Sequence, residues 1–137
     1  MDAFDWTSIV RSTEETKSLY ATPPDLSNEC DLFHVQIDER GTSVTLGFET
    51  SVLPSNPPIT WTAGEYNTLE FYIRFTGVKG LQIAGWDSSA RDAAVTLSPC
   101  GDAGVQVAVE GLGSHLVFTA STALLTRARA YLSTNTA

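Results

Sequence analysis

Residues 68–86 read TLEFYIRFTGVKGLQIAGW, and this stretch decides which kind of fold the chain can adopt. Its first half alternates strictly, with one set of side chains on one face (Leu69, Phe71, Ile73 and Phe75) and a second set on the other (Glu70, Tyr72 and Arg74). Such alternation is typical of a half-buried strand. Leu81 and Ile83 then alternate with Gln82 and Ala84, so a second strand is expected to follow the glycines.

The glycines and the lysine at residues 77–80 do not form a phosphate-binding pattern. A phosphate loop lies between a buried strand and the start of a helix, and its lysine follows the last glycine and precedes Ser or Thr. Here Lys79 precedes Gly80, and the residue after the glycine is Leu81. We therefore interpret TGVKG as a tight connection between antiparallel strands.

The same period of two continues on both sides of this stretch. Residues 30–38 (CDLFHVQID) and 43–50 (SVTLGFET) are joined by turn residues around Gly41, which predicts a β-hairpin. In the first of these, Phe33, Val35 and Ile37 are expected on one face and Leu32, His34, Gln36 and Asp38 on the other. Residues 92–98, 104–111 and 114–120 alternate in the same way and add three strands.

The two ends of the chain show a helical pattern instead. Residues 6–20 place apolar side chains at both ends of a polar middle, and the prolines of ATPPD would end such a helix. Residues 121–132 (STALLTRARAYL) begin with a capping Ser or Thr and carry an apolar stripe at helical spacing. Arg127 and Arg129 would lie near the carboxyl end of this helix, where positive charge is favoured.

These elements predict one α+β domain over residues 1–137. We expect a single, mostly antiparallel meander sheet of about seven strands, because the strands follow one another without helical crossovers. The N- and C-terminal helices would pack on one face of this sheet. The proline-rich residues 51–67 would form a surface loop anchored by Trp61.

Composition limits the partners of the chain. The net charge is −8, from 16 acidic and 8 basic residues, which argues against nucleic acid because such proteins usually present a basic face. No apolar run approaches the roughly 20 residues that span a bilayer, and the acidic N-terminus lacks the features of a secretory signal, so we expect a cytoplasmic protein. Two reduced thiols, Cys30 and Cys100, fit this location. The acidity suits a basic protein partner, and it equally suits solubility alone.

No residue pattern indicates catalysis, a cofactor or a metal site. His34 and His115 are expected on the outer face without ligand spacing, and no nucleophile elbow is present. The mixed outer face of the sheet is the better candidate, as a surface for a basic protein. Its candidate partner-binding residues are Asp38, Glu49, Glu70, Tyr72 and Glu110. An alternative is a small-ligand pocket lined by the three tryptophans.

The order of several motifs resembles the immunity protein 50 family of bacterial polymorphic toxin systems. The matching pieces are PPDL, FHVQIDERGTSVTLGFE, LPSNPPITW, YNTLEFYIRFTGVKGLQIAGW, LVFTA and a closing RAYL. The resemblance implies a non-enzymatic protein without a cofactor, encoded beside a toxin, which it binds and blocks. It also implies structural roles for the shared residues Pro58, Trp61, Gly77, Val78, Leu81 and Trp86. Trp86 is expected to be buried at the end of the sheet.

Overall fold

The described part of the chain is built from strands. The computed structural model describes residues 10–12, 26–27, 29–38, 40, 42–53, 66–85, 94–101, 104–111 and 114–131. Its strands are β1 (Arg11–Ser12), β2 (Cys30–Asp38), β3 (Ser43–Thr50), β4 (Thr68–Thr76), β5 (Lys79–Ala84), β6 (Ala94–Cys100), β7 (Gly104–Gly111), β8 (Ser114–Ala120) and β9 (Thr122–Tyr131). These ranges contain no helix, so the predicted α+β class is wrong and the described fold is all-β.

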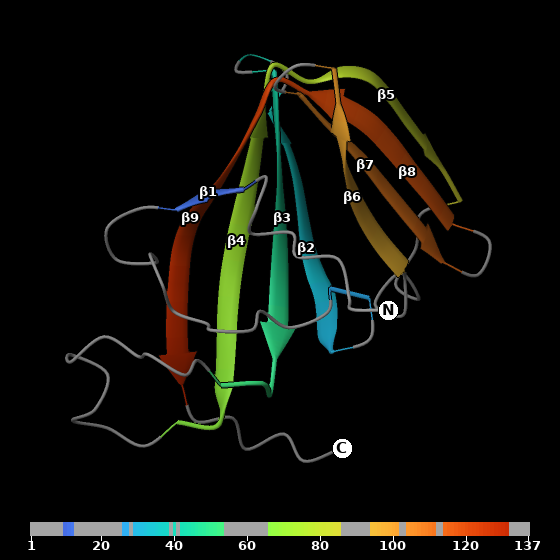
Figure 1. Cartoon of the computed structure of the whole chain (residues 1–137). Coiled ribbons are helices and arrows are strands. Elements are labelled where there is room, and N and C mark those ends of the chain that lie inside the picture. The colour runs from blue at the N-terminus through green and yellow to red at the C-terminus, as the bar shows by residue number, and fades with distance from the viewer. Residues whose placement is uncertain are drawn as a thin grey trace.

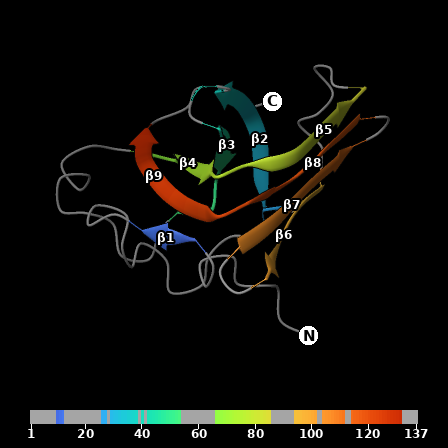
Figure 2. The ribbon, with the colours of Figure 1, turned by 90° about the horizontal axis from the view of Figure 1, so that it is seen from above.

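The strands form two sheets rather than the predicted single meander. The first sheet has the order β1-β9-β4-β3-β2, and the second has the order β5-β8-β7-β6. Figure 1 shows the two sheets meeting at one end and spreading apart toward the other. Viewed from above, the strands of the second sheet run side by side at an angle to the curved first sheet (Figure 2). The predicted β2–β3 hairpin and the antiparallel β6–β7 and β7–β8 pairs are confirmed.

Two neighbouring strands cross together from one sheet to the other. β4 and β9 pair in the first sheet, and their continuations β5 and β8 pair in the second. Gly77 lies at this crossing with φ 66°, a conformation that favours glycine. A Cβ on Gly77 would come within 2.8 Å of the Cβ of Ser121, which lies at the β8–β9 crossing. The prediction that TGVKG connects paired strands is therefore wrong, because β4 and β5 belong to different sheets.

Hydrogen bonds hold this crossing in place. The amide of Ser121 donates to the carbonyl of Thr76 at 2.8 Å, and the hydroxyls of Thr76 and Thr122 share a hydrogen bond. The amide of Val78 donates to the carbonyl of Thr42 at 2.9 Å, which ties the β2–β3 hairpin to the same corner. Backbone hydrogen bonds at this corner therefore join three segments of the chain: the β4–β5 connection, the β8–β9 connection and the β2–β3 turn.

The core lies between the two sheets. It is formed by every second residue of the strands, whose side chains point inward. The largest side chains with almost no exposure are Phe48, Phe71, Phe75, Phe118, Leu46, Leu69, Ile73 and Leu116. Phe75 of the first sheet meets Phe118 of the second edge-to-face, with ring centroids 5.3 Å apart. Phe48 and Phe71 stack on neighbouring strands at the same centroid separation. The core-facing set predicted for β4 is confirmed in full.

The predicted C-terminal helix is strand β9. Ala123 and Leu125 pair with Phe75 and Ile73 of β4, and they are buried. The register then shifts between Ile73 and Tyr72, so Thr126 is the extra residue of a β-bulge. Beyond the bulge Ala128 and Ala130 return to the core side. The bulge moves the period-two pattern by one residue. The apolar residues before and after it therefore have a spacing that resembles that of a helix.

The predicted N-terminal helix is wrong where the structure describes it. Arg11 and Ser12 form β1, which pairs in parallel with Leu124 and Leu125 of β9. Val10, immediately before this strand, is buried in the core. The rest of residues 6–20 lies outside the described residues.

The segment before β2 hydrogen-bonds to β6, which is the edge strand of the second sheet. The hydroxyl of Ser27 donates to the carbonyl of Val95 at 3.0 Å and accepts from the amide of Val95 at 3.0 Å. The neighbouring Leu26 is buried in the core. One serine therefore takes the place of a neighbouring strand at this point of the edge and links the two sheets.

Candidate partner-binding face

The outer face of the first sheet gathers polar and aromatic side chains from four strands. Register places them in rows across β2, β3, β4 and β9. One row is Asp31, Glu49, Glu70 and Arg129, and the next is His34, Gly47, Tyr72 and Arg127. A third row is Gln36, Thr45, Arg74 and Leu124. We call this surface the outer face.

Four of the five predicted partner-binding residues belong to the outer face. Asp38, Glu49, Glu70 and Tyr72 all alternate with core-facing neighbours on β2, β3 and β4. Glu110 lies on the second sheet, opposite His115 of β8, and is exposed there. The five residues were expected on one sheet, so the division into two sheets separates Glu110 from the other four.

Glu70 is the most buried acidic residue of the outer face. Its carboxylate Oε1 accepts a hydrogen bond from the Tyr72 hydroxyl at 3.3 Å and lies 3.3 Å from Arg129 Nε. The Glu70 side chain is 11% exposed, whereas that of Arg129 is 56% exposed. Glu49 lies directly opposite Glu70 on β3, a like-charge arrangement that costs stability unless other groups offset it. Arg129 offsets it from the other side.

Two tyrosines complete this charged network. The guanidinium of Arg129 lies over the ring of Tyr131, 5.2 Å from its centroid. Burial raises the pKa of Tyr72 above its ordinary value, and the neighbouring Glu70 raises it further, against the opposing effect of Arg127 and Arg129. Burial likewise raises the pKa of Tyr131, followed by the charges of Glu49 and Glu70. Both phenols are therefore neutral at ordinary pH, and that of Tyr72 donates to Glu70.

Three aromatic rings form a cluster at the centre of the outer face. Tyr72 meets Phe33 and His34 edge-on, with centroids 5.9 and 5.8 Å apart. Two of these residues crowd Gly47, where a Cβ would lie only 2.8 Å from Tyr72 Cε2 and 2.9 Å from His34 Cβ. Glycine at residue 47 is what lets Tyr72 of β4 and His34 of β2 close over β3.

A bulge puts Phe33 on the outer face. The β2–β3 register shifts between Leu32 and His34, so Phe33 is the extra residue. Leu32 is buried opposite Phe48, and Val35 lies opposite Leu46, so both face the core. The predicted faces of Leu32 and Phe33 are therefore wrong, whereas those of the residues after the bulge are confirmed.

Charge is sorted by strand across the outer face. The charged residues of β2 and β3 on this face are Asp31, Asp38 and Glu49, all of them carboxylates. β9 contributes Arg127 and Arg129, and both are exposed. β4, between them, carries Glu70 and Arg74. The outer face is therefore acidic at its β2 side and basic at its β9 side.

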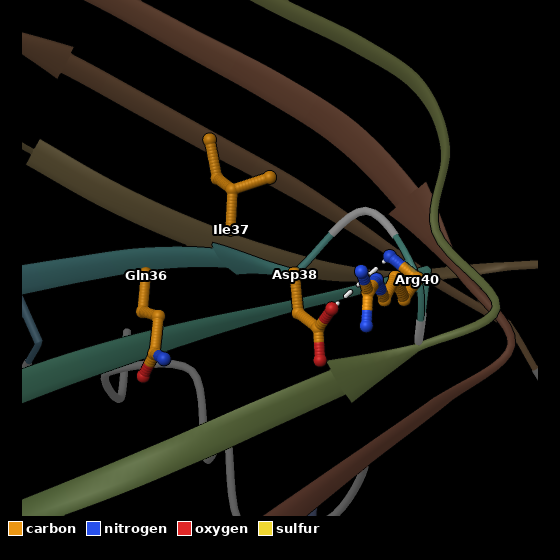
Figure 3. Close-up of a pocket in the computed structure, with 4 residues that line it drawn as sticks. All are labelled: Gln36, Ile37, Asp38 and Arg40. Atoms are coloured by element: carbon orange, nitrogen blue, oxygen red, sulfur yellow. Dashed lines mark hydrogen bonds between the residues drawn. The ribbon is translucent and has the colours of Figure 1, made fainter.

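The end of β2 borders an open hollow of about 570 Å³. It is lined by Gln36, Ile37, Asp38 and Arg40, and Figure 3 shows Ile37 pointing away from the other two strand residues, toward the second sheet. The amide of Arg40 donates to Asp38 Oδ1 at 3.0 Å, which is the dashed contact in Figure 3. Asp38 thereby caps the hairpin turn as well as lying on the outer face.

The opposite side of the molecule is chemically plainer. The outer surface of the second sheet holds a hollow of about 240 Å³, lined by Ala94, Thr96, Ser98, Gln106, Ala108 and Glu110. These side chains are small or neutral, apart from Glu110. The residues described on this surface form no aromatic cluster like the one on the outer face of the first sheet.

The described residues contain no group of three His, Cys, Asp or Glu side chains placed to hold a metal ion. Within the same residues, no helix is long and apolar enough to cross a membrane. Cys30 is buried at the start of β2, and Cys100 is the last residue of β6.

The residues to which the resemblance gave structural roles have different positions. Gly77 occupies the corner, and Val78 packs against the core. Leu81 lies on the edge strand β5 with 36% of its surface exposed. Pro58, Trp61 and Trp86 lie outside the described residues, as does Trp6. The expected burial of Trp86 and the tryptophan-lined pocket are therefore predictions that the structure does not address.

Several residues of the outer face were missed by sequence reasoning. Asp31 and Phe33 were missed because the bulge in β2 breaks the alternation. Arg127, Arg129 and Tyr131 were assigned to a helix, although Arg-Ala-Arg-Ala-Tyr itself alternates and could have indicated a strand.

The fold and the outer face together define a class: a small two-sheet β-domain with one exposed, chemically diverse sheet face. The family model for immunity protein 50 matches residues 12–131, which is most of the chain. The chain therefore belongs to the immunity protein 50 family, and the resemblance seen in its motifs is confirmed. No curated protein and no solved structure matches it.

Proposed function

We propose that this protein neutralises a cognate bacterial toxin by binding it in a one-to-one complex, without catalysing a reaction. The observation that carries the proposal is the family match over residues 12–131, because immunity proteins take a toxin as partner. The outer face supplies a surface suited to such a contact.

The composition of the outer face supports its use as the toxin-binding surface. Tyr and Arg are enriched where protein interfaces gain most of their binding energy. Here Tyr72 and Tyr131 lie beside Arg127 and Arg129, within one exposed sheet face. Tyr72 is held by Glu70 and by the rings of Phe33 and His34, so little side-chain freedom would be lost when a partner covers it.

The test uses the toxin domain encoded beside this gene. Co-expression with that domain should restore growth of a sensitive host, and titration calorimetry of the purified pair should give a one-to-one complex. Absence of protection and of binding, with a folded sample, would contradict the proposal. Protection without a stable complex would contradict the stoichiometric mechanism.

The surface is tested separately from the function. Tyr72→Ala should weaken the complex, whereas Gln106→Ala on the second sheet should leave it unchanged. Gln106 is a suitable control because it is also an exposed residue in the middle of a strand. Equal binding by both variants would remove the outer face from the toxin contact while leaving the proposed function standing.

A further inference from the structure

We infer that the toxin surface bound by the outer face is polarised, with cations opposite β2 and β3 and anions opposite β9. This inference rests on the proposed function and specifies the partner's chemistry. It refines the expectation of a basic partner, which followed from the net charge of −8 and from the carboxylates predicted on the outer face.

The sorted charges carry the inference. Asp31 and Asp38 of β2 are exposed, and Glu49 lies between Asp31 and Glu70 in one row. At the other side of the sheet Arg127 and Arg129 are exposed on β9. Glu70 pairs with Arg129, so the exposed charges that set the two sides apart are Asp31 and Asp38 on β2 and Arg127 on β9.

The aromatic cluster separates the two charged sides. Phe33 and His34 come from β2 and Tyr72 from β4. The three rings contact one another, and Tyr72 and His34 close over Gly47 of β3. An apolar centre flanked by charges matches the usual arrangement of a protein interface, in which the rim is polar. Charges at the rim then fix the orientation of the partner.

A uniformly basic partner would fit only half of this face. Its cations would meet Asp31 and Glu49 favourably and would meet Arg127 and Arg129 as like charges. Like charges brought together at an interface are strongly disfavoured. The overall acidity of the chain speeds the approach of a basic molecule, but the local pattern decides which surface can dock.

Two charge reversals with matched controls test the inference. Asp31→Lys and Arg127→Glu change one exposed residue at either side of the outer face. Glu110→Lys and Lys79→Glu make the same changes in net charge on the second sheet, where both residues are exposed. The affinity of each variant for the neighbouring toxin domain is measured at two salt concentrations, and thermal melting confirms that each variant is folded.

A polarised partner predicts that Asp31→Lys and Arg127→Glu each weaken binding by about tenfold or more, and that the controls change it far less. A uniformly basic partner predicts that Asp31→Lys weakens binding and Arg127→Glu strengthens it, which would overturn the inference. Equal effects of the outer-face variants and their controls would also overturn it. Binding of the toxin domain by the wild-type protein tests the proposed function, whatever the variants show about the charge pattern.

A second copy of this chain is the competing occupant, because a face with one acidic and one basic side is complementary to itself. The molecular mass of the free protein in solution, measured by sedimentation, distinguishes a second copy from the toxin as the occupant of the outer face. A dimer that Arg127→Glu dissociates would assign the outer face to self-association and would overturn the inference. A monomer with the toxin affinities described above supports it.

Discussion

The ring of Tyr72 lies directly over Gly47, so closely that a Cβ on Gly47 would be 2.8 Å from Tyr72 Cε2. The same added Cβ would lie 2.9 Å from the Cβ of His34, which belongs to β2 on the other side of β3. This one glycine therefore determines where the aromatic cluster of the outer face can form. It connects a backbone requirement of β3 with the proposed binding surface.

Gly47→Ala should weaken toxin binding by about tenfold and lower the free energy of unfolding by about 1–3 kcal/mol, because His34 Cβ is fixed to the backbone of β2 and can move only with it. The added methyl displaces Tyr72 and His34, whereas alanine in place of glycine also reduces the entropy lost on folding. Calorimetry with the toxin domain and urea unfolding measure the two effects. Gln106→Ala, at an exposed position of the second sheet, is the control. Unchanged binding by Gly47→Ala would separate the cluster from the contact.

Gly77→Ala should destabilise the fold by about 2–4 kcal/mol, because alanine is strained at positive φ and its Cβ would overlap Ser121. Gly80 is a matched control, since its φ of 67° is nearly the same but nothing lies within 4 Å of the added atom. Gly80→Ala should therefore cost about 1–2 kcal/mol, from backbone strain alone. Urea unfolding compares the two variants. Equal losses would show that the corner tolerates the extra atom.

Phe118→Ala should cost about 3–5 kcal/mol, the usual range for a large aromatic residue removed from a core. Phe118 is 1% exposed and packs edge-to-face on Phe75, so its loss opens a cavity between the two sheets. Val117→Ala, on the outer surface of the same strand, should cost far less. Thermal or urea unfolding measures both variants. A small loss for Phe118→Ala would mean that the sheets can close over the gap.

The protein should lose stability as the pH rises above about 10, the ordinary pKa of tyrosine. The folded state raises the pKa of Tyr72 and Tyr131, so their stabilising effect is present below the unfolded pKa and is lost as the pH rises through the folded values. Phenolate absorbance and unfolding at several alkaline pH values follow this change. Tyr72→Phe and Tyr131→Phe assign the two titrations.

Glu70 links these two tyrosines, which gives a sharper test. Its charge raises the pKa of both, so Glu70→Gln should move both titrations to lower pH. Arg129 lowers both, so Arg129→Gln should move them in the opposite direction. Shifts of the same sign in the two variants would contradict the network around Glu70.

Alternation predicted most strands but could not predict how they are arranged. β2, β3, β7 and β8 have the bounds expected from the sequence, because each has one face in the core. The alternating pattern carries no information on which strands become neighbours. The division into two sheets depends on the corner at Gly77, which has the same glycine signature as a hairpin turn.

The C-terminal strand shows why local preference failed. Leu, Ala and Arg are good helix formers, and residues 121–132 contain many of them. Pairing with β4 overrides that preference, because it buries Ala123 and Leu125 beside the apolar face of β4. The bulge at Thr126 then shifts the alternation by one residue, so a search for a fixed period of two does not detect the whole strand. For the outer face, the same two causes concealed Phe33, Arg127 and Arg129.

The alternation of β2, β3, β4 and β9 has a consequence for how such a protein can evolve. Side chains that build the core and most of those proposed to meet the partner belong to the same strands but point in opposite directions. An exposed residue such as Asp31 or Arg127 can therefore change without creating a cavity, and a new specificity can arise on an unchanged fold. Gly47 and Glu70 differ from such residues, because they lie on the outer face and are nevertheless buried. Diversification should proceed around these two residues rather than through them.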